Sequence, residues 1–296
     1  LHMVSSMEEK NIYATVSELE RCTTVDGPGI RTTVFFKGCN LNCLWCHNPE
    51  GINPKRALLR YSEKCSACGK CVAICPTKQS DCMLCGKCAL LCPNDALELC
   101  GRIVSVDDVF AELEKDRAYY EKSGGGITFS GGECMLQIDF LEELLKKCKN
   151  ANISVAIDTA GNVAWSHFER VIPYTDIFLY DVKCILESLH IQGTGVSNKL
   201  IKENLIKLAS QFPGKIVVRI PVIGGYNATH EEMNAIAEFL APLNISQVEL
   251  LPYHKLGMHK SEAAGVSYKE FTEPPADFLT EWKNRLNSAH RCKCNP

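Results

Sequence analysis

The sequence predicts an α/β protein whose core is a partial (β/α)6 barrel, with a small cysteine-rich segment inserted after the first barrel strand. Two observations lead to this fold. Past residue 101, short apolar strands alternate with amphipathic helices, the pattern of a parallel sheet covered by helices. Residues 56–101 instead carry nine cysteines, eight of them in two closely spaced runs. A chain of 296 residues is long enough for one large domain and such an insert, so the barrel is expected to comprise residues 11–55 and 102–296.

The composition indicates a metal-binding protein of a reducing compartment. Eighteen cysteines are far more than an ordinary globular chain carries. The first ten residues lack the apolar segment of a signal peptide, and no stretch approaches the roughly 18–20 apolar residues of a membrane span. We therefore expect a cytoplasmic protein with no membrane partner, whose reduced thiols are metal ligands. A net charge of −3 gives no electrostatic footprint for nucleic acid, so the expected partner is a small molecule or another protein.

The first cysteine motif follows the β-branched segment 32–36, which is the expected first strand. Cys39, Cys43 and Cys46 have C-x3-C-x2-C spacing. A [4Fe–4S] cluster normally takes four thiolates, so three thiolates leave one iron open to bind a substrate. The alternatives are a zinc site or a disulfide framework. Structural zinc usually takes paired C-x2-4-C units that close a four-ligand site, and the other paired cysteines here belong to a second motif.

The second motif is an internal repeat of the run found in bacterial ferredoxins, C-x2-C-x2-C-x3-C-P. In two-cluster ferredoxins the fourth cysteine of each run binds the other cluster. This rule assigns one cluster to Cys65, Cys68, Cys71 and Cys92, and another to Cys82, Cys85, Cys88 and Cys75. The link 76–81 is too short for the usual ferredoxin strand and helix, so a trimmed module is expected. The insert could relay electrons to the first cluster, or act as a structural clip or as a docking surface for the partner.

The remaining elements are expected in regular order. Further strands are expected within 124–133 and at 153–158, 176–182, 216–222 and 246–252; helices are expected at 106–122, 135–149, 165–172, 198–211, 229–240 and 275–289. In such sheets, ligands bind at the carboxyl ends of the strands. Polar groups follow the expected strands at Gly131-Gly132-Glu133, Asp158-Thr159, Asp181 and Lys183, Arg219 and His254. Ordinary roles remain open for them: Asp158 and Asp181 as caps, Arg219 in an ion pair, and His254 as a structural histidine.

Two motifs resemble a known family. The C-x3-C-x2-C loop resembles the signature of the radical S-adenosylmethionine (SAM) enzymes. The turn Asp26-Gly27-Pro28-Gly29, followed by Ile30-Arg31, resembles that of the glycyl radical enzyme activating enzymes of the pyruvate formate-lyase activating enzyme type. The resemblance extends from Asp26 to Gly257 and includes the two-cluster insert. It implies that SAM binds the open iron and is cleaved reductively to methionine and a 5′-deoxyadenosyl radical. That radical would abstract a hydrogen atom from a backbone glycine in the C-terminal loop of a partner glycyl radical enzyme.

The resemblance also implies roles for individual residues. Cys39, Cys43 and Cys46 would hold the catalytic cluster, Gly131, Gly132 and Glu133 the amino group of SAM, and Lys183 its carboxylate. Asp158, Thr159, Asp181 and a carbonyl near Leu179 would surround a monovalent cation, K⁺ or Na⁺. SAM would also be contacted by Trp45 (unless it only fills the core), Arg219 and His254. Asp26 and Gly27 would line the groove for the partner's loop. Ala160 and Gly224-Gly225 depart from the family pattern, which usually has Asn or Ser, and Pro-Gly, at these places.

Several features stay open at this point. A radical SAM enzyme that modifies a peptide or small molecule, with the extra clusters as electron sinks, is one alternative. A ferredoxin-type electron carrier is another, although it leaves the three-cysteine loop unused. We expect a monomer that receives electrons from a donor such as flavodoxin or ferredoxin. Cys134, Cys148 and Cys184 are interpreted as packing residues, and Cys292 and Cys294 at the chain end have no expected strand or helix partner.

Overall fold

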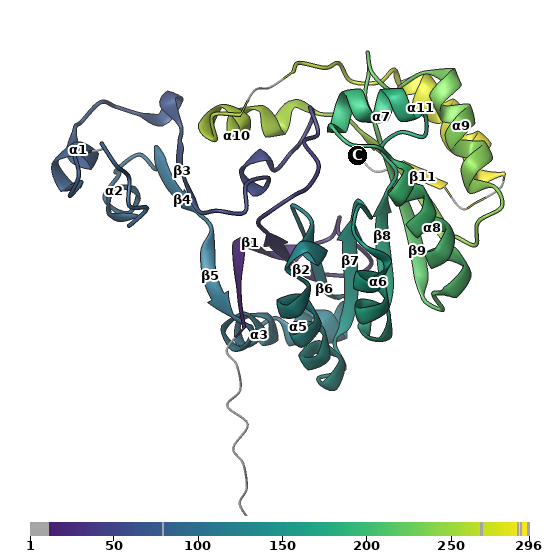
Figure 1. Cartoon of the computed structure of the whole chain (residues 1–296), viewed down its shortest axis with the longest axis horizontal. Helices are drawn as coiled ribbons and strands as arrows, with labels where there is room; N and C mark the ends of the chain where they lie inside the picture. The colour runs from purple at the N-terminus through teal and green to yellow at the C-terminus, as the bar shows by residue number, and fades with distance from the viewer. Residues whose placement is uncertain (1–11, 79, 267–268, 289, 291, 295–296) are drawn as a thin grey trace, which may run out of the picture.

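The computed structural model describes residues 12–78, 80–266, 269–288, 290 and 292–294. Its main feature is a nine-stranded sheet with the order β11-β10-β9-β8-β7-β6-β2-β1-β5. The sheet curves into an open barrel, with helices on its outer face and the cysteine-rich insert projecting from one side (Figure 1). Among the described helices, none is long and apolar enough to cross a membrane.

Six strands run parallel in the middle of this sheet. Each pairs with the next in chain order, as the sequence predicts for a partial barrel. Their bounds are β2 (Arg31–Phe36), β6 (Gly126–Gly131), β7 (Ser154–Thr159), β8 (Ile177–Asp181), β9 (Lys215–Val222) and β10 (Gln247–Pro252). All six differ from the expected bounds by only one or two residues. Their carboxyl ends therefore meet at one rim, where the candidate site was expected.

Three further strands were not expected. β1 (Tyr13–Thr23) runs antiparallel to β2, and β5 (Arg102–Ser105) pairs antiparallel with β1. β11 (Cys292–Cys294) pairs in parallel with β10. The expectation that the chain end has no strand partner is therefore wrong. A strand of three residues carries almost no local signal, because its stability comes from pairing with a strand far away in the sequence.

Helices cover the outer face of the sheet. The expected helices correspond to α5 (Ile138–Asn150), α6 (Trp165–Val171), α8 (Lys199–Gln211), α9 (His230–Leu240) and α11 (Ala276–Asn287). The helix expected at 106–122 is broken into α3 (Val106–Glu114) and α4 (Arg117–Ser123). Asp116 lies at the break, where it accepts hydrogen bonds from Thr32 and Arg21. Two short helices were missed, α7 (Glu187–Thr194) and α10 (Met258–Ala263).

Alternation along the strands separates the apolar core from the barrel interior. On β8, Phe178 and Tyr180 belong to the large core between sheet and helices, whereas Leu179 belongs to a small separate cluster with Ala156, Ile177 and Val217. Successive strand residues point to opposite faces, so Asp181 shares the interior face with Leu179. The same alternation puts Arg219 on the interior face of β9, between the core residues Val218 and Ile220.

The insert leaves the main sheet after β2 and returns to it at β5. It contains the antiparallel pair β3 (Ala57–Arg60) and β4 (Leu97–Cys100), with the short helices α1 (Lys70–Ile74) and α2 (Lys87–Leu90) between them. Figure 1 shows α1 and α2 at the outer end of this arm, away from the barrel. In the described part of the chain, five single 3-10 turns complete the fold: η1 (Pro49–Gly51), η2 (Ser62–Lys64), η3 (Cys134–Gln137), η4 (Ile172–Tyr174) and η5 (Lys255–Gly257).

Candidate functional site

The three-cysteine loop is fixed to its surroundings by backbone hydrogen bonds. The N–H groups of Gly38 and Cys39 donate to the carbonyls of Gly51 and Ile52, at 2.7 and 3.0 Å. Farther along, Leu44 N–H donates to the carbonyl of Gly193 in α7 at 2.9 Å. The loop is therefore held from both sides before any ligand binds, which favours a preorganised site.

A cavity at the carboxyl rim of the strands joins this loop to the strand ends. It is lined by Cys39, Leu41, Cys43, Cys46, Asn48, Ile52, Ser130, Gly131, Gly132, Asp158, Thr159, Ala160, Asp181 and Lys183. Most of these residues were candidates from sequence, and they come from the loop after β2 and the ends of β6, β7 and β8. The sequence reasoning missed Ser130. The signal was available, since Ser130 directly precedes the two glycines in the strand.

The three thiols fit a metal cluster better than a free state. Burial raises the pKa of Cys39 and Cys46 to about 11 and that of Cys43 to about 12. Without a metal the thiols would stay protonated, whereas a bound metal ion deprotonates a coordinating thiol. Among the described residues, no three His, Cys, Asp or Glu side chains converge on the position of a single metal ion. The fit to a cluster therefore rests on the shared cavity and on the three buried thiols.

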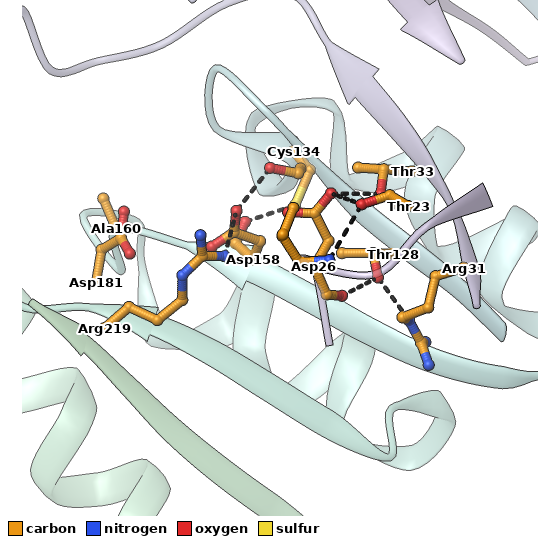
Figure 2. Close-up of polar contacts among 12 residues, drawn as sticks. Thr23, Asp26, Arg31, Thr33, Thr128, Cys134, Asp158, Ala160, Asp181 and Arg219 are labelled. Carbon is orange, nitrogen blue, oxygen red and sulfur yellow. Dashed lines mark hydrogen bonds and ion pairs between the residues drawn. The ribbon is translucent and has the colours of Figure 1, made fainter. Parts of the chain in front are cut away.

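Two ion pairs carry the charge of the cavity. Lys183 Nζ lies 2.8 Å from Asp181 Oδ2, and Arg219 Nη1 lies 3.4 Å from Asp158 Oδ2. Ser130 Oγ also donates to Asp158 Oδ2 at 2.7 Å, while Asp158 Oδ1 is buried and, within the described part of the chain, has no hydrogen-bond partner. Burial raises the pKa of Asp158 although Arg219 opposes the shift. Figure 2 shows Arg219 reaching toward Asp158, with Asp181 nearby.

Glu133 does not face the cavity as a free ligand. Its Oε2 accepts from Thr159 Oγ1 at 2.8 Å and from Ala160 N–H at 3.0 Å, and Oε1 accepts from Met135 N–H at 3.3 Å. The side chain is fully buried, and burial raises its pKa to about 7. Glu133 thus ties the end of β6 to the end of β7. The hydroxyl of Thr159 is committed to the same contact. The sequence left two acceptors open for the amino group of SAM, Glu133 or nearby backbone carbonyls, and these contacts favour the carbonyls.

The two glycines before Glu133 allow close backbone packing. A Cβ on Gly131 would lie 2.3 Å from the nitrogen of Phe36, and one on Gly132 would lie 2.2 Å from the carbonyl oxygen of Gly38. These distances are far below van der Waals contact. The glycines thus bring the end of β6 against the start of the cysteine loop, in addition to lining the cavity.

Trp45 lies in an aromatic cluster beside the loop. Its ring centroid is 4.8 Å from that of Tyr226 and 6.3 Å from that of Phe271, and only 6% of the residue is exposed. Trp45 is not among the residues that line the cavity. These contacts correspond to the core-filling alternative, and its stacking on adenine stays a prediction.

His254 stacks on the histidine that follows the last loop cysteine. The ring centroids of His47 and His254 are 4.1 Å apart. Burial and the neighbouring His254 lower the pKa of His47 to about 4, so this ring is neutral near pH 7. His254 lies just after β10, at the expected end of the sheet. His47 was not considered from sequence, although its position beside Cys46 was a signal.

Asp26 lies in a buried polar network at the start of β2. Its Oδ2 accepts from Thr23 Oγ1 at 3.1 Å and Thr33 Oγ1 at 2.8 Å, and its carbonyl accepts from Thr128 Oγ1 at 2.6 Å. Figure 2 shows these contacts, with the side chain of Arg31 approaching Thr128. The neighbouring Gly27 has φ +119°, a conformation that favours glycine. The side chain of Asp26 thus stabilises the turn, in which Pro28 is exposed.

The insert brings the eight cysteines of its two runs together in two groups. One cavity is lined by Cys65, Cys68, Cys71 and Cys92, together with Tyr61 and other residues. Another is lined by Cys75, Cys82, Cys85 and Cys88. Each group combines three cysteines of one run with the fourth cysteine of the other.

Comparisons with known proteins show the family of this chain. Residues 33–240 match the family model of the Radical SAM superfamily. The trans-4-hydroxy-L-proline dehydratase activating enzyme of Clostridioides difficile is 46% identical over 93% of this chain and 96% of the relative. The indoleacetate decarboxylase activating enzyme of Tractidigestivibacter scatoligenes is 36% identical over 97% of this chain and 98% of the relative. The choline trimethylamine-lyase activating enzyme of Oleidesulfovibrio alaskensis is also 36% identical, over 86% and 88%.

Solved structures agree on the fold. A domain of the pyruvate-formate lyase-activating enzyme from Bacteroides vulgatus ATCC 8482 aligns with a TM-score of 0.50 and 27% identity, over 58% of this chain and 99% of that domain. A radical SAM methyltransferase from Sphaerobacter thermophilus aligns over 95% of this chain and 73% of that chain, with a TM-score of 0.57 and 14% identity. The chain therefore belongs to the radical SAM superfamily, and within it to the activating enzymes of glycyl radical enzymes. The family, the barrel fold and the enzyme class predicted from sequence are confirmed.

Proposed function

We propose that this enzyme holds SAM in the rim cavity, on a [4Fe–4S] cluster bound by Cys39, Cys43 and Cys46. Reduced, that cluster supplies the electron that cleaves SAM to methionine and a 5′-deoxyadenosyl radical, which takes a hydrogen atom from a glycine of the partner. The observation that carries the proposal is the cavity itself, which brings the three cysteines together with Lys183, Asp158 and the glycines of β6.

The residues of the chain act by binding and orientation. Lys183 provides a cation for the carboxylate of SAM, and its pair with Asp181 keeps it oriented: burial lowers the pKa of Lys183, but Asp181 and Cys43 outweigh that effect and raise it. Glu133 joins the ends of β6 and β7 through its carboxylate. The amino group of SAM would therefore donate to backbone carbonyls and not to this carboxylate. Arg219 neutralises Asp158 beneath this site.

A monovalent cation, K⁺ or Na⁺, would bind between Asp158 and Asp181. Asp158 Oδ1, buried and without a hydrogen-bond partner in the described residues, supports such a ligand. The hydroxyl of Thr159 is already engaged with Glu133, so Thr159 would contribute through its backbone. The contribution of Arg219, Trp45 and His254 to SAM binding belongs to the same proposal.

Residues 56–101 form, in this proposal, a module with two further [4Fe–4S] clusters. One takes Cys65, Cys68, Cys71 and Cys92, and the other takes Cys75, Cys82, Cys85 and Cys88. The two cavities described above support this crossed assignment. Residues 11–55 and 102–296 then make up the barrel.

The insert is also the proposed docking surface for the electron donor. Large apolar side chains on it are exposed: Val72, Ile74, Met83, Leu90 and Leu91. Residues 56–101 contain six basic and four acidic residues although the whole chain has a net charge of −3, so this arm suits an acidic electron carrier such as flavodoxin or ferredoxin. The enzyme would work as a monomer in the cytoplasm, with Asp26 and Gly27 beside the incoming glycine loop. The 46% sequence identity to the trans-4-hydroxy-L-proline dehydratase activating enzyme makes such a dehydratase the first partner to test.

The test is anaerobic SAM cleavage by the reconstituted, reduced enzyme, assayed as 5′-deoxyadenosine with the partner dehydratase present. We expect cleavage by the wild type together with a glycyl radical signal on the partner, and neither with Cys43→Ala. Cys148→Ala is the matched control, because Cys148 is a buried packing residue of α5. Failure of the iron-loaded, reduced wild type to cleave SAM would contradict the proposal.

A further inference from the structure

The turn that carries Lys183 is held by side chains from distant elements. Residues 182–186 connect β8 to α7. Asn198, at the start of α8, donates through Nδ2 to the carbonyls of Cys184 and Ile185, each at 2.9 Å. The carboxylate of Glu232 in α9 accepts from the N–H groups of Ile185 and Leu186. Buried backbone groups without partners are costly, so these bonds specify one conformation of the turn.

Asn227 makes the contact to Lys183 itself. Its Nδ2 donates to the carbonyl of Lys183 at 2.9 Å and to the carbonyl of Pro221 at 2.7 Å. Its Oδ1 accepts from the N–H of Ile223 at 2.7 Å. Only 1% of the residue is exposed, so water does not substitute for these bonds. These three hydrogen bonds all go to backbone groups.

These bonds join two strand ends that each carry a cation of the site. Pro221 is two residues past Arg219 in β9, and Lys183 is two residues past the end of β8. A further bond from Val182 N–H to the carbonyl of Arg219 at 2.9 Å continues the pairing of these strands up to the turn. Asn227 extends the link between β8 and β9 by one more residue, beyond the last backbone hydrogen bond between the two strands.

We infer that Asn227 is a positioning residue for SAM, which holds the backbone of Lys183 so that its ammonium group is presented to the carboxylate of SAM. The inference rests on the proposed function, since it requires that Lys183 binds SAM. Asn227 lines no part of the cavity, so it acts through Lys183. Small displacements of a binding group weaken an interaction steeply, and Asn227 fixes the backbone of the residue that carries that group.

The test is SAM binding and turnover by reconstituted Asn227→Ala and Asn227→Asp. The aspartate variant keeps the size of the side chain but cannot donate to two carbonyls. We expect the SAM concentration for half-maximal 5′-deoxyadenosine formation to rise about tenfold or more, with the maximal rate within about threefold of wild type. The SAM concentration that half-converts the electron paramagnetic resonance spectrum of the reduced cluster is expected to rise in parallel.

Asp116→Ala is the control. Asp116 is also buried and hydrogen bonded, to Thr32 and Arg21, but it lies at the break between α3 and α4 and not at the rim. The Asp116→Ala variant is expected to have a lower melting temperature and an unchanged SAM concentration for half-maximal 5′-deoxyadenosine formation. If the Asn227 variants lower the melting temperature as Asp116→Ala does and leave SAM half-saturation unchanged, Asn227 is only structural and the inference is wrong. If Asn227→Ala does not load iron, Asn227→Ser is measured instead.

Failure of the proposed function is separately visible. A wild type that binds SAM, measured by equilibrium dialysis, but does not cleave it contradicts the proposed reaction, and the Asn227 variants are then compared by their SAM affinity. A wild type that binds no SAM contradicts both.

Discussion

Arg219 and Asp158 form an ion pair on the interior face of the sheet, with Nη1 and Oδ2 3.4 Å apart and side-chain exposures of 14% and 17%. They come from strands that are not neighbours, since β8 lies between β7 and β9. The pair therefore spans β8 on the interior face of the sheet, and its aspartate lines the rim cavity. Removing one partner of such a largely buried pair leaves a charge that water solvates poorly.

Loss of this pair is expected to destabilise the enzyme. Arg219→Leu leaves Asp158 without its cation and should lower the free energy of unfolding by about 3 kcal/mol, as for other broken buried pairs. The double variant Arg219→Leu, Asp158→Asn should recover part of this loss, because neither of the two positions then carries an unpaired charge. Urea unfolding of the two variants and the wild type measures both effects. An unchanged free energy of unfolding in the single variant would show that the pair is solvated.

Sequence reasoning was most successful where the signal is local. The six parallel strands follow from apolar segments and their spacing, and the cysteine runs follow from a fixed pattern. β1 was missed because it carries Glu18, Glu20 and Arg21 among its eleven residues. Such a strand is defined by its antiparallel partners β2 and β5, and β-propensity depends on those partners.

The orientation of site side chains could not be predicted from sequence. The Gly-Gly-Glu motif marks the end of β6 correctly, but whether Glu133 faces the cavity depends on Thr159 and Ala160 of the next strand. Trp45 is similar, since its packing depends on Tyr226 and Phe271, which lie far away in the sequence. Residue types therefore predicted the location of the site, while tertiary contacts decide which side chains line it.

Gly193 allows α7 to lie close to the cysteine loop, because it has no Cβ. A Cβ at this position would lie 2.1 Å from the hydroxyl of Tyr226 and 2.7 Å from Cζ3 of Trp45. We therefore expect Gly193→Ala to displace Trp45 and the adjacent Cys46. The iron bound after reconstitution should then fall by about the amount that one cluster contains. Iron and sulfide analysis measures this loss. Gly124→Ala is the control, because Gly124 has φ +68° but no atom within 4 Å of an added Cβ; equal iron loss in both variants would show a general folding defect.

The free cysteines are expected to differ sharply in reactivity. Cys22 is exposed, whereas Cys148 and Cys184 are buried, and burial raises the pKa of each of these two thiols to about 12. Only the thiolate reacts, so at pH 7 about one part in 10⁵ of each buried thiol would be reactive even if it were accessible. Iodoacetamide treatment of the reconstituted enzyme followed by peptide mass spectrometry should label Cys22 alone among these three. Labelling of Cys148 at a similar rate would contradict its burial.

Charge reversal on the insert tests the proposed donor surface. Lys70 and Lys87 begin α1 and α2, close to the exposed apolar side chains of the arm. Lys70→Glu and Lys87→Glu should raise the concentration of flavodoxin or ferredoxin needed for half-maximal SAM cleavage by about threefold to tenfold, and high salt should reduce the difference from wild type. Cleavage driven by dithionite should not change, since a small reductant needs no docking surface. Lys122→Glu, on α4 of the barrel, is the control. If the donor titration is the same for all four proteins, the donor binds elsewhere and the apolar side chains of the insert have another role.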